Sequence, residues 1–310
     1  MNISDVKSES EFCDRIRAYL YIASTGNDPF KAAFVVNAIL NVPFCIIATL
    51  ANLVVIFSIW RSPTLRSPAN LLLIGLALSD LGVGLIMQPF YIAFLIYFAI
   101  QGISSSTCIS TVAVALAGSF FSCVSFVMVT AISLERYLSL RLHLRYEELV
   151  TVKRVRYFLI ISWLLFGISS FIWVLFLPKF KSFYYSAGIL LCLLICTGAY
   201  VKIYRIVRFH VQHIKNLEVC GKVHRRKKVA YNMFVVYCAL LCCYLPYSIF
   251  LGVAKIAGYS KWNWICINFT LTVVNINSSI NPLIYCYRMR DIRRAILHTL
   301  YVALSRFKLK

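Results

Sequence analysis

The stretch "NSSINPLIY", Asn277–Tyr285, places several polar side chains and a proline inside an apolar run that extends over residues 263–287. Polar groups are costly in hydrocarbon, and proline removes a backbone hydrogen-bond donor from a helix. A membrane helix tolerates both where neighbouring helices or waters supply the missing partners. The stretch therefore indicates a helix that packs inside a membrane bundle.

The whole chain has the composition of a membrane protein. Of its 310 residues, 61% are hydrophobic and only 14% are charged, which is more apolar surface than a soluble chain of this length can bury. We predict an all-α membrane protein, a seven-transmembrane helix bundle, because seven apolar runs are long enough to cross ~30 Å of hydrocarbon. These runs lie near residues 32–60, 68–98, 105–137, 152–177, 183–209, 226–254 and 263–287.

Three regions follow from these runs. Residues 1–31 form an extracellular N-terminal segment, in which we expect no cleavable signal peptide because no basic start precedes an apolar core. Residues 32–287 form the transmembrane domain. In residues 288–310, basic and apolar residues alternate at helical spacing, which predicts a short cytoplasmic amphipathic helix and tail in contact with membrane lipid.

The distribution of basic residues predicts the orientation. Most of the 32 lysine and arginine residues fall in the loops after the first, third and fifth runs and in the C-terminal tail. An excess of positive charge marks the cytoplasmic side, so we expect a multi-pass plasma-membrane protein with its N-terminus outside and its C-terminus inside. The basic residues then act as topology signals and lipid contacts, and no nucleic-acid partner is expected.

Twelve cysteines are present, and most lie inside the apolar runs, where they are expected to be small core residues. Only Cys13, Cys108 and Cys266 fall near the oxidising outer face. At most one disulfide can form among these three, and the sequence does not choose the pair.

Four polar side chains in the middle of the runs have the chemistry of a cation site. Asp80 is the only acid deep in any run, Asn277 and Asn281 share one helix face, and Ser125 lies mid-run. If these faces converge, they form an oxygen-lined cavity with one negative charge, which suits sodium. The alternative is a hydrogen-bonded cluster that only fastens helices together.

Prolines and one charge pair mark positions of mechanical interest. Pro246 and Pro282 should kink the sixth and seventh helices, giving either a fixed shape or a hinge. Glu135 and Arg136 stand at the inner end of the third run, at the edge of a bundle, which favours an ion pair. No nucleotide-binding or metalloprotease motif appears, so we expect no enzymatic activity and no covalent cofactor.

Taken in order, these residues resemble the rhodopsin-like (class A) G-protein-coupled receptors over nearly the whole chain. One matching motif falls on each run: Asn52 in "LANLVV", Asp80 in "LALSDL", Glu135-Arg136-Tyr137, Trp163 in "IISWLL", Tyr200 in "YVKIYRI", Cys243-Tyr244-Leu245-Pro246 and Asn281-Pro282-Leu283-Ile284-Tyr285. Each motif alone is weak, but the ordered set is specific. The resemblance implies a receptor that converts binding of an extracellular ligand into activation of a heterotrimeric G protein.

The resemblance also implies roles for single residues. The activation switch would comprise Glu135, Arg136, Tyr137, Tyr200, Tyr244, Pro246, Asn281, Pro282 and Tyr285. The contact with the G protein would comprise Arg136, Leu144 and Tyr146, and Tyr146 would also hydrogen-bond Glu135. Asp80, Ser125, Asn277 and Asn281 coincide with the family's sodium site.

Several departures bear on the ligand. Thr111 stands where the family has an outer cysteine, Cys192 replaces a proline, and the second outer loop is very short, as in the melanocortin, adenosine, cannabinoid and lysophospholipid receptors. Leu251 stands where adenosine receptors have an asparagine. An apolar, aromatic pocket and a neutral or lipid-like ligand are therefore expected. Its candidate lining is Phe90, Tyr91, Phe94, Phe121, Tyr244, Tyr247 and Phe250.

A seven-helix transporter or channel is the alternative function. Such a protein would be expected to show two internally symmetric halves with broken helices in matching positions, and the sequence shows no such repeat.

Overall fold

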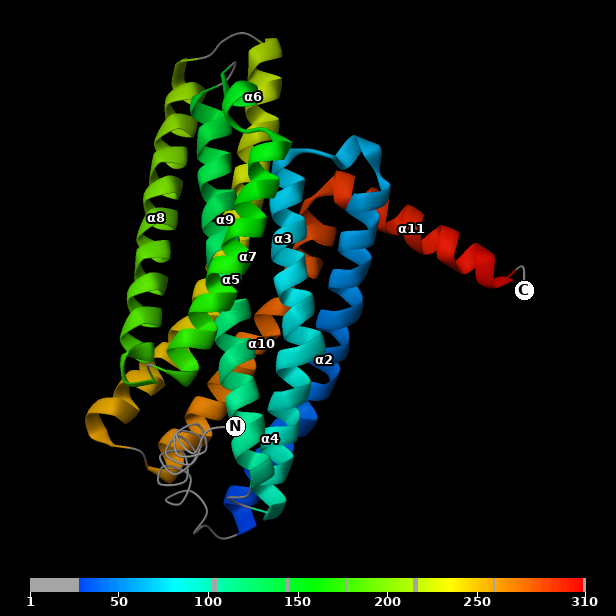
Figure 1. The fold of residues 1–310 in the computed structure, drawn as a ribbon. Helices are drawn as coiled ribbons and strands as arrows, with labels where there is room; N and C mark the ends of the chain where they lie inside the picture. The colour runs from blue at the N-terminus through cyan, green and yellow to red at the C-terminus, as the bar shows by residue number, and fades with distance from the viewer. Residues whose placement is uncertain are drawn as a thin grey trace.

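The computed structural model describes residues 28–101, 105–142, 145–176, 178–213, 217–258 and 260–308. Over these residues the fold is a bundle of long helices running along one axis (Figure 1). The bundle consists of α2 (Asp28–Arg61), a rod made of α3 (Pro68–Gly82), the π-helical turn η2 (Val83–Met87) and α4 (Gln88–Gln101), then α5 (Ser105–Arg141), α7 (Val152–Leu175), α8 (Pro178–His213), α9 (Leu217–Ala257) and α10 (Lys261–Arg288). The shorter elements are η1 (Pro63–Leu65), α6 (Tyr146–Leu149) and α11 (Arg290–Lys308).

The predicted seven-helix bundle is confirmed, with two differences of detail. The predicted fourth and fifth runs, 152–177 and 183–209, leave the segment "PKFKS" (178–182) between them as a loop, but it is helical, because α7 ends at Leu175 and α8 already begins at Pro178. Six helical segments of the described chain are long and apolar enough to cross a membrane, and α10 is not among them. α10 has 28 residues, which is sufficient length, but its inward face is polar and lowers its mean hydropathy.

Buried side chains form two clusters along the bundle axis. We call the end of the bundle near Arg136 inner and the opposite end outer, after the orientation expected from the charges. The outer cluster is largely aromatic and includes Phe34, Tyr91 and Phe94. The inner cluster is mainly aliphatic and joins helices from α2 to α11, with Tyr285 fully buried in it. The candidate ligand region and the candidate switch thus lie at opposite ends.

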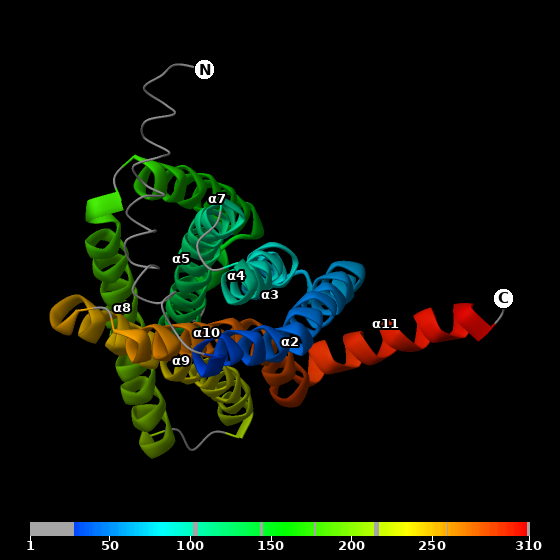
Figure 2. The ribbon, with the colours of Figure 1, turned by 90° about the horizontal axis from the view of Figure 1, so that it is seen from below.

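The C-terminal helix α11 leaves the bundle after Arg288 and points away from it in both views (Figure 2). Ile292 and Ile296 are buried where α11 packs on α2 and α10, whereas Leu297 and Tyr301 are exposed. The predicted amphipathic helix is thus present, and its exposed apolar side chains suit a position on the membrane surface.

Close packing of the rod formed by α3, η2 and α4 against α2 depends on Gly84. A Cβ atom built on Gly84 would lie 2.7 Å from Thr49 Oγ1 and 2.8 Å from the backbone nitrogen of Thr49. The Cys45 thiol also donates to the Gly84 carbonyl oxygen at 3.1 Å. Small residues of this kind let membrane helices approach closely.

We expect Gly84→Ala to lower the melting temperature of the purified protein, because overpacking against backbone costs about 1–3 kcal/mol. Gly198→Ala is the matched control, since a Cβ at Gly198 would meet nothing within 4 Å and alanine favours the helix by about 0.5–1 kcal/mol. Equal shifts of the two variants in a thermal melt would contradict the packing role of Gly84.

Candidate functional site

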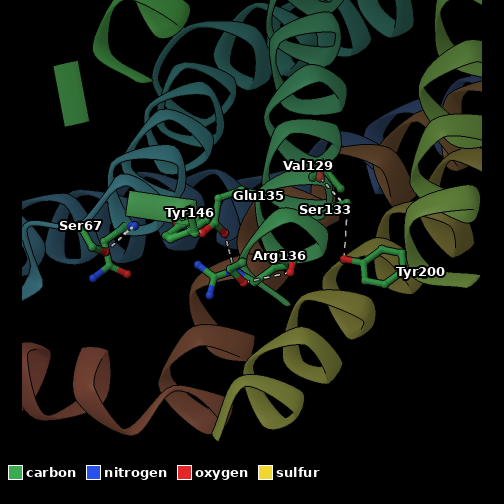
Figure 3. A network of polar contacts seen from close by, with 9 residues as sticks. Ser67, Val129, Ser133, Glu135, Arg136, Tyr146 and Tyr200 are labelled. Atoms are coloured by element: carbon green, nitrogen blue, oxygen red, sulfur yellow. Dashed lines mark hydrogen bonds and ion pairs between the residues drawn. The ribbon is translucent and has the colours of Figure 1, made fainter. Parts of the chain in front are cut away.

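The inner end of α5 carries the predicted charge pair. Arg136 Nε lies 2.6 Å from Glu135 Oε2, and both side chains are largely shielded from solvent. The hydroxyl of Tyr146, on α6, donates a hydrogen bond to the other carboxylate oxygen of Glu135 (Figure 3). Glu135 therefore holds Arg136 along α5 and at the same time fixes the position of α6. Leu144 lies outside the described residues.

A second contact links α5 to α8 at Ser133, which precedes this pair on α5. Ser133 Oγ lies 3.2 Å from the hydroxyl of Tyr200 and 2.8 Å from the carbonyl oxygen of Val129 (Figure 3). The ring of Tyr200 stacks on Tyr237 of α9 with centroids 5.4 Å apart. Tyr200 thus connects three helices at the end where α5 carries its charges.

Tyr137, next to Arg136, is surrounded by positive charge. Arg141 Nη1 donates to its hydroxyl at 2.7 Å, and Lys202 Nζ lies 5.5 Å from its ring centroid. The inner end of α5 and α8 therefore presents cations around an aromatic ring, an arrangement that attracts acidic groups.

The proline-containing stretch of α10 is fastened to α2. Asn52 Nδ2 donates to the carbonyl oxygen of Ser278 at 2.9 Å, and Ser279 Oγ donates to the carbonyl oxygen of Phe44 at 2.9 Å. Pro282 lies inside α10, and Pro246 lies inside α9. These two hydrogen bonds join polar groups of the proline-containing stretch to a neighbouring helix, as expected for polar groups buried in a membrane.

The four residues of the predicted sodium site are all buried at mid-bundle. Asn281 Nδ2 donates to Asp80 Oδ2 at 2.8 Å, which brings α10 to α3. Ser125 Oγ is 2.9 Å from Ser79 Oγ, a residue that the sequence had not singled out although it precedes Asp80. Asn277 is buried on the same helix face as Asn281.

Several oxygens at this level have no hydrogen-bond partner among the described residues. They are Asp80 Oδ1, Asn52 Oδ1, Asn277 Oδ1 and Asn281 Oδ1. A buried oxygen without a donor is costly, and a hard cation or water satisfies several at once. A carboxylate together with amide and hydroxyl oxygens is a donor set that fits sodium.

The predicted pocket residues lie in different environments. Tyr91, Phe94 and Phe121 are buried within the outer aromatic cluster. Tyr244 lies deeper, where its hydroxyl donates to Ser122 Oγ at 3.1 Å and its ring centroid lies 4.7 Å from that of Phe126. Tyr247 and Phe250 are partly buried on α9.

Phe90 differs from the other pocket candidates. It is 44% exposed and shares the exposed side of its rod with Leu85 and Ile86, whereas its neighbour Tyr91 is buried. One helix cannot turn both side chains toward the same interior, so Tyr91 is the stronger candidate.

Sequence reasoning missed a buried polar cluster between α2, α4 and α10. It comprises Asn37, Asn41, Tyr91, Asn268, Thr272 and Asn275. The available signal was spacing: Asn37 and Asn41 are four apart in one apolar run, as are Asn268 and Thr272 in another. Such pairs mark inward faces that must find partners in the bundle.

The outer cysteines are partly assigned. Cys108 is disulfide-bonded, and Cys266 is a free thiol. Cys13 lies outside the described residues. The disulfide of this face therefore involves the outer end of α5 and leaves α10 untethered through Cys266.

Comparisons with known proteins point to a receptor family. The family model described as "7 transmembrane receptor (rhodopsin family)" matches residues 51–182. The chain is 25% identical to the adenosine receptor A2b of Gallus gallus over 82% of this chain and 85% of the relative. It is 27% identical to the adenosine receptor A2b of Rattus norvegicus (80% and 84% covered) and 25% identical to the adenosine receptor A2a of Homo sapiens (80% and 68% covered).

Proposed function

Because the chain is a rhodopsin-like (class A) G-protein-coupled receptor, we propose that an uncharged extracellular ligand, bound in the outer half of the bundle, switches it at the Glu135–Arg136 end. The receptor family implies an extracellular ligand and a G protein, and it does not favour a transporter or channel. We further propose that the receptor lies in the plasma membrane with its N-terminus outside.

One observation supports an uncharged ligand. Among the buried polar side chains of the described chain, only Asp80 and Glu135 are acidic, and none is a lysine or arginine. Asp80 is engaged at mid-bundle with Asn281, and Glu135 is engaged at the inner end with Arg136. A charged ligand group in the outer half would lose its hydration without gaining a buried partner of opposite charge.

The names of the relatives suggest one uncharged candidate, adenosine. Leu251 offers no hydrogen bond at the position where the resemblance places an asparagine in adenosine receptors. We therefore propose that adenosine is not the ligand and that a more apolar uncharged molecule is.

The inner end supports the coupling part of the proposal. Glu135 holds Arg136 beside α6, and Tyr200 joins α5 to α8 and α9. Movement of α9 would disturb the Tyr200–Tyr237 contact and free this end for an acidic or helical partner.

The mid-bundle oxygens support a sodium ion as a state-dependent ligand. Asp80, Asn277, Asn281 and Ser125 would hold it, and it would supply the positive charge that Asp80 otherwise lacks there. An ion that binds the resting state more tightly than the active state lowers activity by mass action.

Guanine-nucleotide exchange on purified heterotrimeric G proteins tests the proposed function. The full-length protein in lipid nanodiscs is presented with members of each G-protein class and with a panel of uncharged lipids, adenosine and charged amines. We expect exchange above empty nanodiscs with at least one G protein, raised by an uncharged lipid. A response confined to amines would overturn the uncharged ligand class, and a response confined to adenosine would overturn the proposal that adenosine is not the ligand. No exchange in any combination would overturn the coupling.

A further inference from the structure

The outer end of α5 is covalently bonded to another part of the chain. Cys108, in the first turn of α5, is disulfide-bonded and buried. Every other cysteine whose side chain the structure describes is a free thiol: Cys45, Cys123, Cys192, Cys196, Cys238, Cys242, Cys243, Cys266 and Cys286. Of the twelve cysteines in the chain, this leaves Cys13 and Cys220 as candidates for the partner of Cys108.

The bundle keeps Cys220 far from Cys108. The Cα atoms of a disulfide lie within about 7 Å of each other. Residue 220 lies in the first turn of α9, which begins at the inner end of the bundle, whereas α5 begins at the outer end (Figure 1). α9 has 41 residues, so at 1.5 Å per residue its two ends are about 60 Å apart. A bond between Cys108 and Cys220 is therefore excluded.

The other outer connections offer Cys108 no partner. α7 ends at Leu175 and α8 begins at Pro178, and the sequence has no cysteine between them. Cys266, near the outer end of α10, is a free thiol. The remaining cysteine on the outer side of the chain is Cys13.

The chain between Cys13 and α2 is long enough to reach α5. Fourteen residues stand between Cys13 and Asp28, where α2 begins at the outer end. An extended chain advances about 3.3–3.6 Å per residue, so a segment of this length spans up to about 50 Å. α4 packs on both α2 and α5, and neighbouring helix axes lie about 8–10 Å apart, so the required span is about 20 Å. Cys13 can thus meet Cys108 without any change in the bundle.

We propose that Cys13 and Cys108 form a disulfide that joins the N-terminal segment to α5. The bond closes a loop that contains α2, α3, η2 and α4, and it fastens these elements to the next helix of the bundle. It anchors α5 from the N-terminus, because the connection between α7 and α8 has no cysteine. The inference goes beyond the proposed function, since it concerns how the outer end is held and requires neither a ligand nor a G protein.

Formation of the bond is a two-electron oxidation of two thiols. The thiolate of one cysteine attacks a protein disulfide of the secretory compartment and forms a mixed disulfide with that oxidant. The thiolate of the other cysteine then displaces the oxidant, which leaves as a dithiol with the two electrons and two protons. Disulfides persist on the extracellular side of the membrane, which is the side on which we propose the N-terminus to lie.

Loss of the bond should destabilise the receptor through its unfolded state. A disulfide restricts the unfolded chain, and the restriction grows with the length of the loop that it closes. The loop from Cys13 to Cys108 is long, because it contains the whole of α2 and of the rod formed by α3, η2 and α4. We therefore expect the melting temperature to fall by at least about 5 °C when the bond is absent.

Peptide mapping of the full-length receptor from eukaryotic cells tests the bond directly. The monomer band of a non-reducing gel is used, free thiols are blocked with N-ethylmaleimide as the protein unfolds, and the chain is digested with trypsin and chymotrypsin without reduction. We expect a linked pair of peptides that contain Cys13 and Cys108 and that separate on reduction, while Cys266 carries the blocking group. A blocked Cys108, or Cys108 linked to any other cysteine, would overturn the proposal.

Thermal melts of alanine variants separate the bond from its two side chains. Cys13→Ala and Cys108→Ala each remove the whole bond, so each should lower the melting temperature. Adding Cys13→Ala to Cys108→Ala should lower it no further, because the two residues act through one interaction. Cys266→Ala is the matched control, since it removes a free outer thiol and should melt close to the wild type.

Additive losses in the double variant, or a loss from Cys266→Ala equal to that from Cys13→Ala, would contradict the bond. Neither measurement uses nucleotide exchange, so the bond is separable from the proposed function. A linked pair in a receptor that activates no G protein would contradict only the coupling, whereas exchange by a receptor without the linked pair would contradict only the disulfide.

Discussion

Replacing Arg136 with alanine should abolish G-protein activation while the receptor still reaches the cell surface. Arg136 is the cation that Glu135 holds at the inner end of α5, and alanine leaves no charge for an acidic or helical partner to meet. Glu135 keeps the hydrogen bond from Tyr146, so its carboxylate is not left without a partner. We expect nucleotide exchange to fall to the level of empty membranes, a loss of about tenfold or more, equivalent to ~1.4 kcal/mol.

The measurement compares exchange at matched surface amounts of receptor, counted with an extracellular epitope label. Arg156→Ala is the control, because Arg156 is an exposed arginine at the inner end of α7 and makes the same loss of charge. Signalling by Arg136→Ala at the level of Arg156→Ala would remove Arg136 from the switch.

Replacing Asp80 with asparagine should remove the response of the receptor to sodium. In the wild type, raising sodium at constant ionic strength should lower activity by about fivefold or more, as is usual for coupling between two sites. The asparagine keeps the size of the side chain and can still meet Asn281, but it removes the only buried acid found at that level of the described chain. A neutral site attracts the cation far less, so activity should become independent of sodium.

The titration replaces sodium by a large organic cation, so that screening of surface charge stays constant. Asp291→Asn makes the same chemical change at an exposed position on α11 and is expected to keep the full sodium response. If Asp80→Asn retains the wild-type response, the four residues serve only to fasten α3, α5 and α10 together.

The sequence alone predicted the helices because long apolar runs bounded by charge leave few alternatives in a membrane. The single acid at Asp80 and the amide at Asn281 were enough to suggest that α3 and α10 meet, and they do at 2.8 Å. The Glu135–Arg136 pair was predictable for a similar reason, since adjacent opposite charges at a bundle edge have few other partners.

Hydrogen-bond partners, unpaired polar groups and the exposure of single side chains could not be predicted, because they depend on tertiary structure. An asparagine such as Asn37 or Asn41 in an apolar run indicates an inward face, but it does not say which helix supplies the partner, and here Thr272 lies more than two hundred residues away. The buried Gln88 carboxamide has no hydrogen-bond partner among the described residues, which is visible only when every neighbouring donor and acceptor has been placed. The exposure of Phe90 likewise follows from how its rod is rotated, which composition does not determine.

That rotation is set by the π-helical turn η2, Val83–Met87, which accommodates one residue more than an α-helical turn would. Every side chain beyond it is therefore turned by roughly 100° relative to an uninterrupted helix. Loss of a single residue within η2 would rotate α4, so that Tyr91 turns away from Asn37 and Asn268. A different row of α4 side chains would then face α2. A one-codon deletion at this point would thus change which side chains line the outer interior without substituting any residue of α4.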